Sequence, residues 1–286
     1  MVDLNSMDFF EALFSQSFIQ RALLMGLLAS FACGVIGSYV VVKRIVFISG
    51  GIAHAVLGGM GIAYYLGFHP LIGAIVFALM SALLIGIISL KTRQREDTII
   101  GAFWAIGMAV GLIFISRTPG YNADLMSYLF GNILLASSQD IYIIIALDVV
   151  IAVMVFLFYK QFLAICFDEE YARLQGVKVE ALYLLLLCLI ALTVVILIQV
   201  VGIIMVIALL TLPAGVAAHY VRNLAGMMLL SVLLGSGFTS CGIYLSYEPN
   251  LPAGATIIIL AGAVYLLSSI YKEWRIRDIK KKSVKA

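Results

Sequence analysis

Long apolar segments separated by short polar ones dominate this chain. An apolar helix of about 20 residues can cross the roughly 30 Å of hydrocarbon in a bilayer, and segments of this kind recur nine times. We therefore predict an all-α polytopic membrane bundle with about nine transmembrane helices, forming a single transmembrane domain over residues 1–286. The expected spans are residues 17–42, 46–66, 71–90, 98–115, 141–159, 181–200, 202–219, 224–244 and 254–271.

The sixth and seventh of these spans are hard to separate. Residues 184–210 are almost continuously apolar, and only Gln199 and Gly202 indicate a turn between two helices. A count of eight or ten spans therefore stays open.

Composition and charge agree with a membrane protein. Hydrophobic residues make up 64% of the 286 and charged residues 12%, whereas soluble domains have roughly 45–50% and about 25%. If the N-terminus lies outside and the spans alternate, all of the 18 lysines and arginines except Arg21 and Arg117 fall in inner segments. The positive-inside rule then places the C-terminus in the cytoplasm. Because these cations are scattered over five loops, we expect them to face the anionic surface of the lipid bilayer and no nucleic acid.

The second span carries a histidine among glycines. Gly50, Gly51, Gly58 and Gly61 lie three, four or seven residues from His54, so one helix face presents an imidazole and almost no other side chain. Such a face permits close approach of another helix. His54 is therefore a candidate functional residue, and the alternative is a neutral histidine that is hydrogen-bonded across a packing face.

Two carboxylates are further candidates for functional residues. Asp148 is the carboxylate that lies well inside a predicted span, where an ionisable group is costly and faces protein or water. Its role is either a pathway contact or a hydrogen bond between helices. Asp124, in the outer loop over residues 118–132, is a weaker candidate at the entrance, and its alternative role is a helix cap.

The inner loop over residues 167–177 predicts a short helix. Asp168 is suited to the N-cap, Glu169 and Glu170 to the positive end of the helix dipole, Arg173 to the negative end, and Gly176 to a left-handed position after the last turn.

This short helix also has an apolar face. Phe167, Tyr171 and Leu174 are spaced to share one side of a helix that projects into water. We interpret this side as a docking surface for a cytoplasmic protein. The alternative is a helix lying flat on the lipid interface, although its acidic first turn disfavours an anionic membrane surface.

A proline lies inside the seventh predicted span. Pro213 removes one backbone hydrogen bond and allows a bend, with Thr211 close enough to bond a freed carbonyl. The bend is a candidate gate or a fixed structural kink.

Several motifs that would supply energy or catalysis are missing from the sequence. There is no G-x-x-x-x-G-K-[ST] segment for nucleotide phosphates and no H-E-x-x-H metalloenzyme motif, and the four cysteines form no C-x-x-C pair. We therefore expect a transport protein, whose energy comes from another source, rather than an enzyme. An ion-coupled secondary metal transporter is the alternative, but it would need intramembrane carboxylates, and Asp148 alone gives it little support.

Five segments, in order and spacing together, resemble the permease subunits of zinc and manganese ABC importers. They are residues 50–59, 124–131, 167–177, 201–217 and 251–256. The resemblance implies a homodimer in the plasma membrane of a prokaryote, a cytoplasmic ATP-binding subunit and an extracellular or periplasmic metal-binding protein. It also implies that the transported divalent ion is zinc or manganese, with iron left open, and that no cofactor is bound permanently.

The chain departs from this family at one position. Many members have Asp-x-x-x-His in the second span, and here Gly50 occupies the place of the acid, so His54 alone is carried over as a metal ligand. In a symmetric dimer a second copy would supply a second His54, and we expect the glycines to let the two helices approach one another.

Overall fold

The computed structural model describes residues 9–91, 96–118, 131, 133, 137–249 and 251–285. Within them every regular element is a helix, which confirms the predicted all-α class. Eight helices are long and apolar enough to cross a membrane. They are α2 (Ser17–Lys43), α3 (Val46–Tyr65), α4 (Pro70–Lys91), α5 (Glu96–Ser116), α7 (Ser138–Phe167), α9 (Val179–Val201), α11 (Leu224–Tyr247) and α12 (Ala253–Lys285). The short helices are α1 (Phe9–Ser15), α8 (Glu169–Leu174), η3 (Ile203–Met205) and α10 (Val206–Tyr220).

The seventh expected span is shorter than predicted. Gly202, with φ of 78°, ends α9 at the turn that the sequence indicated, and η3 and α10 follow it. The 15 residues of α10 rise about 22 Å, which is less than the hydrocarbon thickness of about 30 Å. Because α10 packs against α2, α11 and α12, its ends can be covered by protein rather than by lipid.

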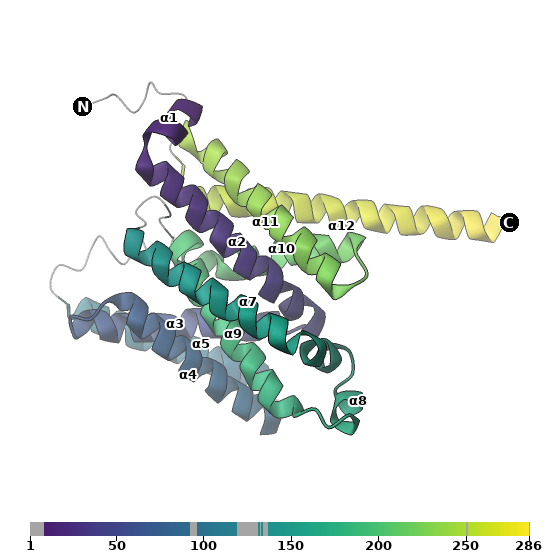
Figure 1. Ribbon diagram of the computed structural model, residues 1–286, viewed down its shortest axis with the longest axis horizontal. Helices are drawn as coiled ribbons and strands as arrows, with labels where there is room; N and C mark the ends of the chain where they lie inside the picture. The colour runs from purple at the N-terminus through teal and green to yellow at the C-terminus, as the bar shows by residue number, and fades with distance from the viewer. Residues whose placement is uncertain are drawn as a thin grey trace.

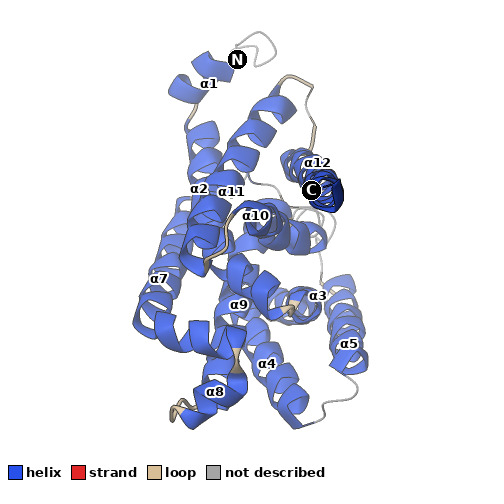
Figure 2. Cartoon of the chain, turned by 90° about the vertical axis from the view of Figure 1, so that its right-hand side faces the viewer, coloured by secondary structure: helices blue, strands red, loops and turns tan. Residues whose placement is uncertain are grey.

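The helices form two groups joined by α9. One group consists of α2, α10, α11 and α12, and the other of α3, α4 and α5. Helix α9 contacts α2, α3, α4 and α7, and Figure 2 shows it between the two groups with α7 on the flank. Figure 1 shows α1 at one end of the bundle, and α8 and the end of α12 toward the other.

Helices α3 and α5 touch backbone to backbone. A Cβ atom added to Gly61 would lie 2.6 Å from the carbonyl oxygen of Gly111, and one added to Gly58 would lie 3.0 Å from that of Gly107. Gly107 and Gly111 themselves form a G-x-x-x-G pair on α5, a pattern that permits close helix contact in bilayers. Glycine on both helices therefore fixes the position of α3, and with it that of His54, relative to α5.

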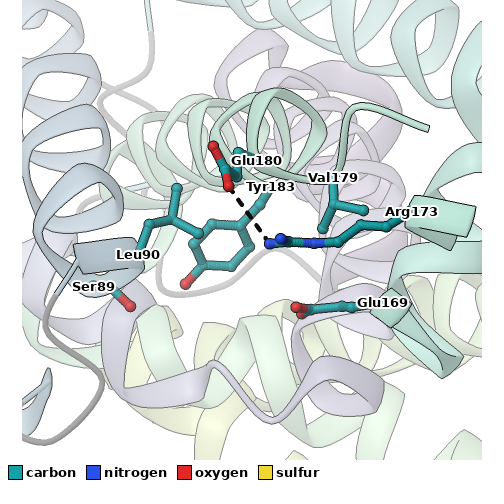
Figure 3. A pocket seen from close by; sticks show the side chains of 7 residues that line it. All are labelled: Ser89, Leu90, Glu169, Arg173, Val179, Glu180 and Tyr183. Carbon is teal, nitrogen blue, oxygen red and sulfur yellow. Dashed lines mark ion pairs between the residues drawn. The ribbon is translucent and has the colours of Figure 1, made fainter. Parts of the chain in front are cut away.

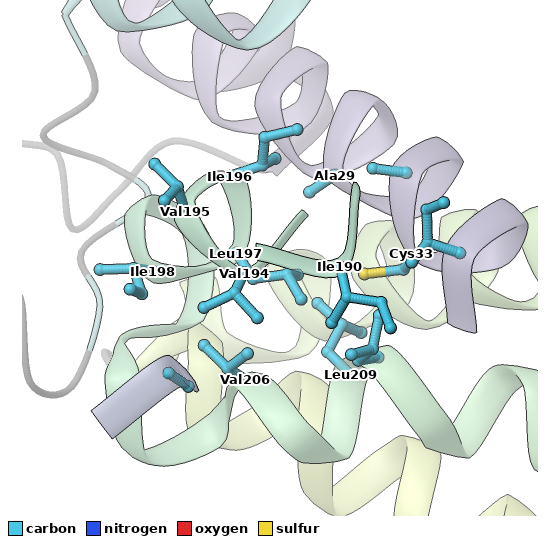
Figure 4. Packing of buried hydrophobic residues seen from close by; sticks show 14 of the residues in the cluster. Ala29, Cys33, Ile190, Val194, Val195, Ile196, Leu197, Ile198, Val206 and Leu209 are labelled. Atoms are coloured by element: carbon cyan, nitrogen blue, oxygen red, sulfur yellow. The ribbon is translucent and has the colours of Figure 1, made fainter. Parts of the chain in front are cut away.

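The central part of the core surrounds α9. Ile190, Val194 and Leu197 of α9 are fully buried, and they pack with Cys33 of α2 and Leu209 of α10 (Figure 4). Because α9 is covered by protein on nearly all sides, it provides a fixed support between the helix that bears His54 and the helices of the other group.

Candidate metal pathway and docking site

His54 lies within α3 with 8% of its surface exposed. Its ring stacks on Trp104 of α5, with the ring centroids 3.9 Å apart and the planes 7° from parallel. The Nδ1 atom is buried and has no hydrogen-bond partner among the described residues. A buried imidazole nitrogen without a partner is costly, and it is also the kind of atom that a metal ion binds.

Asp148 is the second buried ionisable group. It lies on α7 with 5% of its surface exposed, and neither of its carboxylate oxygens has a hydrogen-bond partner in the described part of the chain. The alternative role of Asp148, a hydrogen bond between helices, is therefore not seen within the described residues. Helix α7 packs against α2 and α9, whereas His54 faces α5, so the structure does not bring Asp148 and His54 into one site.

A complete metal site is not present in the described residues. Within residues 9–91, 96–118, 137–249 and 251–285 no group of three or more His, Cys, Asp or Glu side chains could hold an ion. The third candidate, Asp124, lies outside the described residues, as does most of the outer loop that we expect at the entrance.

The glycines around His54 contact helices of the same chain. Gly50 faces Ile207 of α10 and Trp104, and Gly51 faces Ile100 of α5. Gly58 and Gly61 face α5, as described above, and all four glycines are buried. The expectation that they bring α3 close to a second copy is therefore wrong, because their neighbours within one chain already occupy that space.

Pro213 does not divide α10. The helix is continuous over Val206–Tyr220, and the Thr211 hydroxyl donates to the carbonyl of Ile207 at 2.7 Å. Proline at 213 frees the carbonyl four residues earlier, at Leu209, so Thr211 does not bond the carbonyl that we expected. The function of the bend at Pro213 as a gate stays a prediction.

The predicted cytoplasmic helix is present as α8. The Asp168 side chain accepts a hydrogen bond from the Tyr171 backbone at 2.9 Å, as an N-cap does. Gly176 has φ of 78° after the last turn, and Arg173 lies in that turn. The local chemistry of residues 168–176 thus specifies this helix.

The side of α8 that faces away from the bundle is apolar and exposed. Phe167, Tyr171 and Leu174 are 68%, 57% and 85% exposed, whereas Ala172 on the opposite side is fully buried. The helix therefore rests on the bundle through Ala172 and presents Tyr171 and Leu174 to its surroundings. Phe167, which we expected on the same helix, is the last residue of α7, because extended Asp168 separates the two helices.

Charged contacts hold both ends of α8. The Lys43 ammonium at the end of α2 pairs with Glu169, and Arg173 lies 3.5 Å from Glu180 of α9. Figure 3 shows the second pair beside a cavity of 140 Å³ between α4, α8 and α9. The residues that line it are Ser89, Leu90, Glu169, Arg173, Val179, Glu180 and Tyr183.

Sequence reasoning missed two residues at these sites. Trp104, which stacks on His54, could have been found from the G-x-x-x-G pair three residues later in the same helix, since this pair indicates a close helix partner. Lys43 gives no local signal, because its partner Glu169 is 126 residues away in the chain.

Comparisons with known proteins place the chain in a family. Residues 15–272 match the model of the ABC 3 transport family. The chain is 50% identical over 255 residues to an uncharacterized membrane protein of Synechocystis, covering 89% of this chain and 91% of that protein. It is 35% identical over 265 residues to the manganese transport system membrane protein MntC of Listeria monocytogenes, covering 93% and 94%.

A solved structure is also similar. The structure described as PsaBC from Streptococcus pneumoniae in complex with Fab contains a chain that matches with a TM-score of 0.83 and 32% identity, covering 91% of this chain and 93% of that one. Sequence and fold thus agree over almost the whole length, and the chain belongs to the ABC 3 transport family.

Proposed function

We propose that this chain is the permease subunit of an ATP-driven importer of divalent metal ions and that manganese is its main cargo. Membership in the ABC 3 transport family supports the ATP-driven class, and the name of the Listeria relative supports manganese over zinc. The chain is then a transport subunit and not an enzyme. The family also argues against an ion-coupled secondary transporter.

The observation that carries this proposal is the unpartnered Nδ1 atom of His54. This nitrogen belongs to a side chain that can bind a metal ion in its neutral form, and it is buried within a membrane helix. Trp104 stacks on the imidazole and fixes the plane of the ring. A single imidazole per subunit binds an ion weakly, which suits a pathway from which the ion must also leave. A second copy of the chain would supply a second His54, which is packed against α5 of its own subunit.

Partners complete the importer. A metal-binding protein delivers the ion to the outer mouth near Asp124, and an ATP-binding subunit docks on Tyr171 and Leu174 of α8. This arrangement requires α8 and the C-terminus to lie in the cytoplasm of a bacterial plasma membrane, in agreement with the positive-inside rule. Closure of the two ATPases then moves α8 and opens the inner end of the pathway.

The test is uptake by the complete complex in liposomes. Native chain, His54→Ala and the control His69→Ala are each reconstituted with the ATPase and the metal-binding protein, and uptake of radiolabelled manganese, zinc and iron is measured with and without ATP. His69 lies at a turn, and its Nδ1 atom accepts from the Leu71 backbone.

We expect ATP-dependent manganese uptake that falls at least about tenfold in His54→Ala, an energy of roughly 1.4 kcal/mol, and is unchanged in His69→Ala. Preferred uptake of zinc would contradict the assignment of the cargo. Accumulation driven by a proton or sodium gradient without the ATPase would contradict the proposed function.

A further inference from the structure

Lys43 joins three segments that are far apart in the chain. Its ammonium group donates to the carbonyl of Ile165 at 2.7 Å and pairs with the carboxylate of Glu169. Only 13% of the Lys43 side chain is exposed, and lysine is rarely buried to this extent unless it is paired. The end of α2 is thus fastened to the junction of α7 and α8.

The same lysine lies directly before the helix that bears His54. Arg44 follows it with φ of 61°, and its backbone N–H bonds back to Val41, so the chain turns at once into α3 at Val46. His54 is eight residues further on, which corresponds to a rise of about 12 Å along the helix. A displacement of Lys43 therefore reaches α3 without an intervening flexible loop.

Helix α7 has a break that precedes its contact with Lys43 in the chain. Phe158 has non-helical angles, φ −106° and ψ 15°, inside the otherwise continuous helix. After the break, Phe162 is fully buried and packs edge-to-face against Tyr39 of α2, with the ring centroids 5.5 Å apart. The part of α7 that follows Phe158 thus packs on the same end of α2 that Lys43 fastens.

The second ion pair that holds α8, between Arg173 and Glu180, is weaker than the pair of Lys43 with Glu169. Arg173 and Glu180 are 3.5 Å apart, and both side chains are at least half exposed. Exposed pairs of this kind contribute little to stability. Of these two ion pairs, the partly buried one of Lys43 is therefore the stronger polar connection between α8 and the membrane helices.

We propose that residues 159–174, here called the coupling segment, move together with the end of α2 about a hinge at Phe158, and that Lys43 transmits this movement from docked α8 to α3 and His54. This inference rests on the proposed function, because it takes an ATPase that binds α8 as the source of movement. It assigns to Lys43 a positioning role, since the side chain does not touch the transported ion.

The first test measures coupling. Lys43→Met keeps the unbranched side chain as far as the position of Cε and removes the ammonium donors, while Asp168, Tyr171 and Leu174 remain for α8 and docking. We expect the reconstituted complex to bind the ATPase and hydrolyse ATP, while the number of metal ions imported per ATP falls about tenfold, within the usual range for coupling between two sites. The control Lys178→Met removes an exposed lysine near α8 and should leave this ratio unchanged.

Two further variants keep the test decisive if Lys43→Met folds poorly. Glu169→Gln changes a half-exposed side chain and should also lower the number of ions per ATP, and Lys43→Arg should retain the native ratio. Because Lys43 and Glu169 act as one unit, the double variant Lys43→Met/Glu169→Gln should be no worse than Lys43→Met alone. A native ratio in Lys43→Met or in Glu169→Gln would overturn the proposal.

The second test measures movement without requiring transport. After the exposed Cys241 is replaced by serine, spin labels are placed on Gln175 after α8, on Phe47 at the start of α3, and on Tyr142 before the hinge. When ATP binds the complex, we expect the distance from Gln175 to Phe47 to stay constant and the distance from Gln175 to Tyr142 to change.

A change between Gln175 and Phe47 in the native chain would show that Lys43 does not hold the two parts together, and it would overturn the proposal. A complex that hydrolyses ATP but imports no metal would contradict the proposed function instead, and the label distances would still decide whether the coupling segment moves as stated.

Discussion

The most direct test of the docking surface is Leu174→Ala. The Leu174 side chain is 85% exposed, so nearly all of its apolar surface is available to a partner. Truncation to alanine removes three carbon atoms, each worth about 0.8 kcal/mol when buried, which gives a loss of about 2 kcal/mol on docking. This corresponds to a dissociation constant for the ATPase subunit that is about 30-fold higher.

The assay is the affinity of the purified permease in nanodiscs for the separately purified ATPase, measured by biolayer interferometry. Leu66→Ala is the matched control, since Leu66 is 59% exposed and follows α3, which ends away from α8. Neither change should alter the thermal midpoint of the permease. Equal binding of Leu174→Ala and the native chain, or an equal loss in Leu66→Ala, would refute the argument that docking buries this face of α8.

Three further substitutions test the packing and the local structure. Gly107→Ala places a Cβ atom 2.9 Å from the Ala55 carbonyl oxygen and should lower the free energy of unfolding by about 1–3 kcal/mol. Gly101→Ala on the same helix is the control, because its Cβ atom meets nothing within 4 Å, and it should leave thermal unfolding unchanged. Gly176→Ala should cost about 1–2 kcal/mol, because its φ of 78° suits glycine, and hydrogen exchange of the α8 amides should become faster. Asp168→Ala removes the N-cap bond and should weaken α8 by about 1 kcal/mol, which the same exchange measurement detects.

The sequence was sufficient for α8 because the interactions that define this helix are local. Its N-cap Asp168, the charges of its first and last turns and Gly176 all lie within ten residues, and each acts on backbone groups a few positions away. The same reasoning correctly gave Tyr171 and Leu174 as exposed apolar residues of this helix, but it also assigned to it Phe167, which ends α7. It could not give the contact of Glu169 with Lys43, which depends on the packing of α7 against α2.

Close helix approach could be predicted from the glycines, but not the identity of the approaching helix. The face around His54 was interpreted as a contact with a second copy, whereas α5 of the same chain fills most of it. The G-x-x-x-G pair at Gly107 and Gly111 was the signal that could have indicated α5. The break at Phe158 has no comparable signal, since neither proline nor glycine occurs there.

Hydropathy cannot show which of these helices are central, because lipid is as apolar as the protein core. Helices α7 and α9 are both strongly apolar, yet most of α9 is buried by protein and most of α7 is not. Buried small polar residues are more informative. Between α2 and α11, Ser30 lies 3.1 Å from Thr239 and Ser38 lies 3.4 Å from Ser231, and all four are buried. Each hydroxyl can instead donate its single proton to a carbonyl of its own helix, so each separate helix can enter the bilayer with its hydroxyls bonded, and in the packed pair one of the two hydroxyls donates to the other. The pairs then favour this contact over contact with lipid, which offers no polar partner.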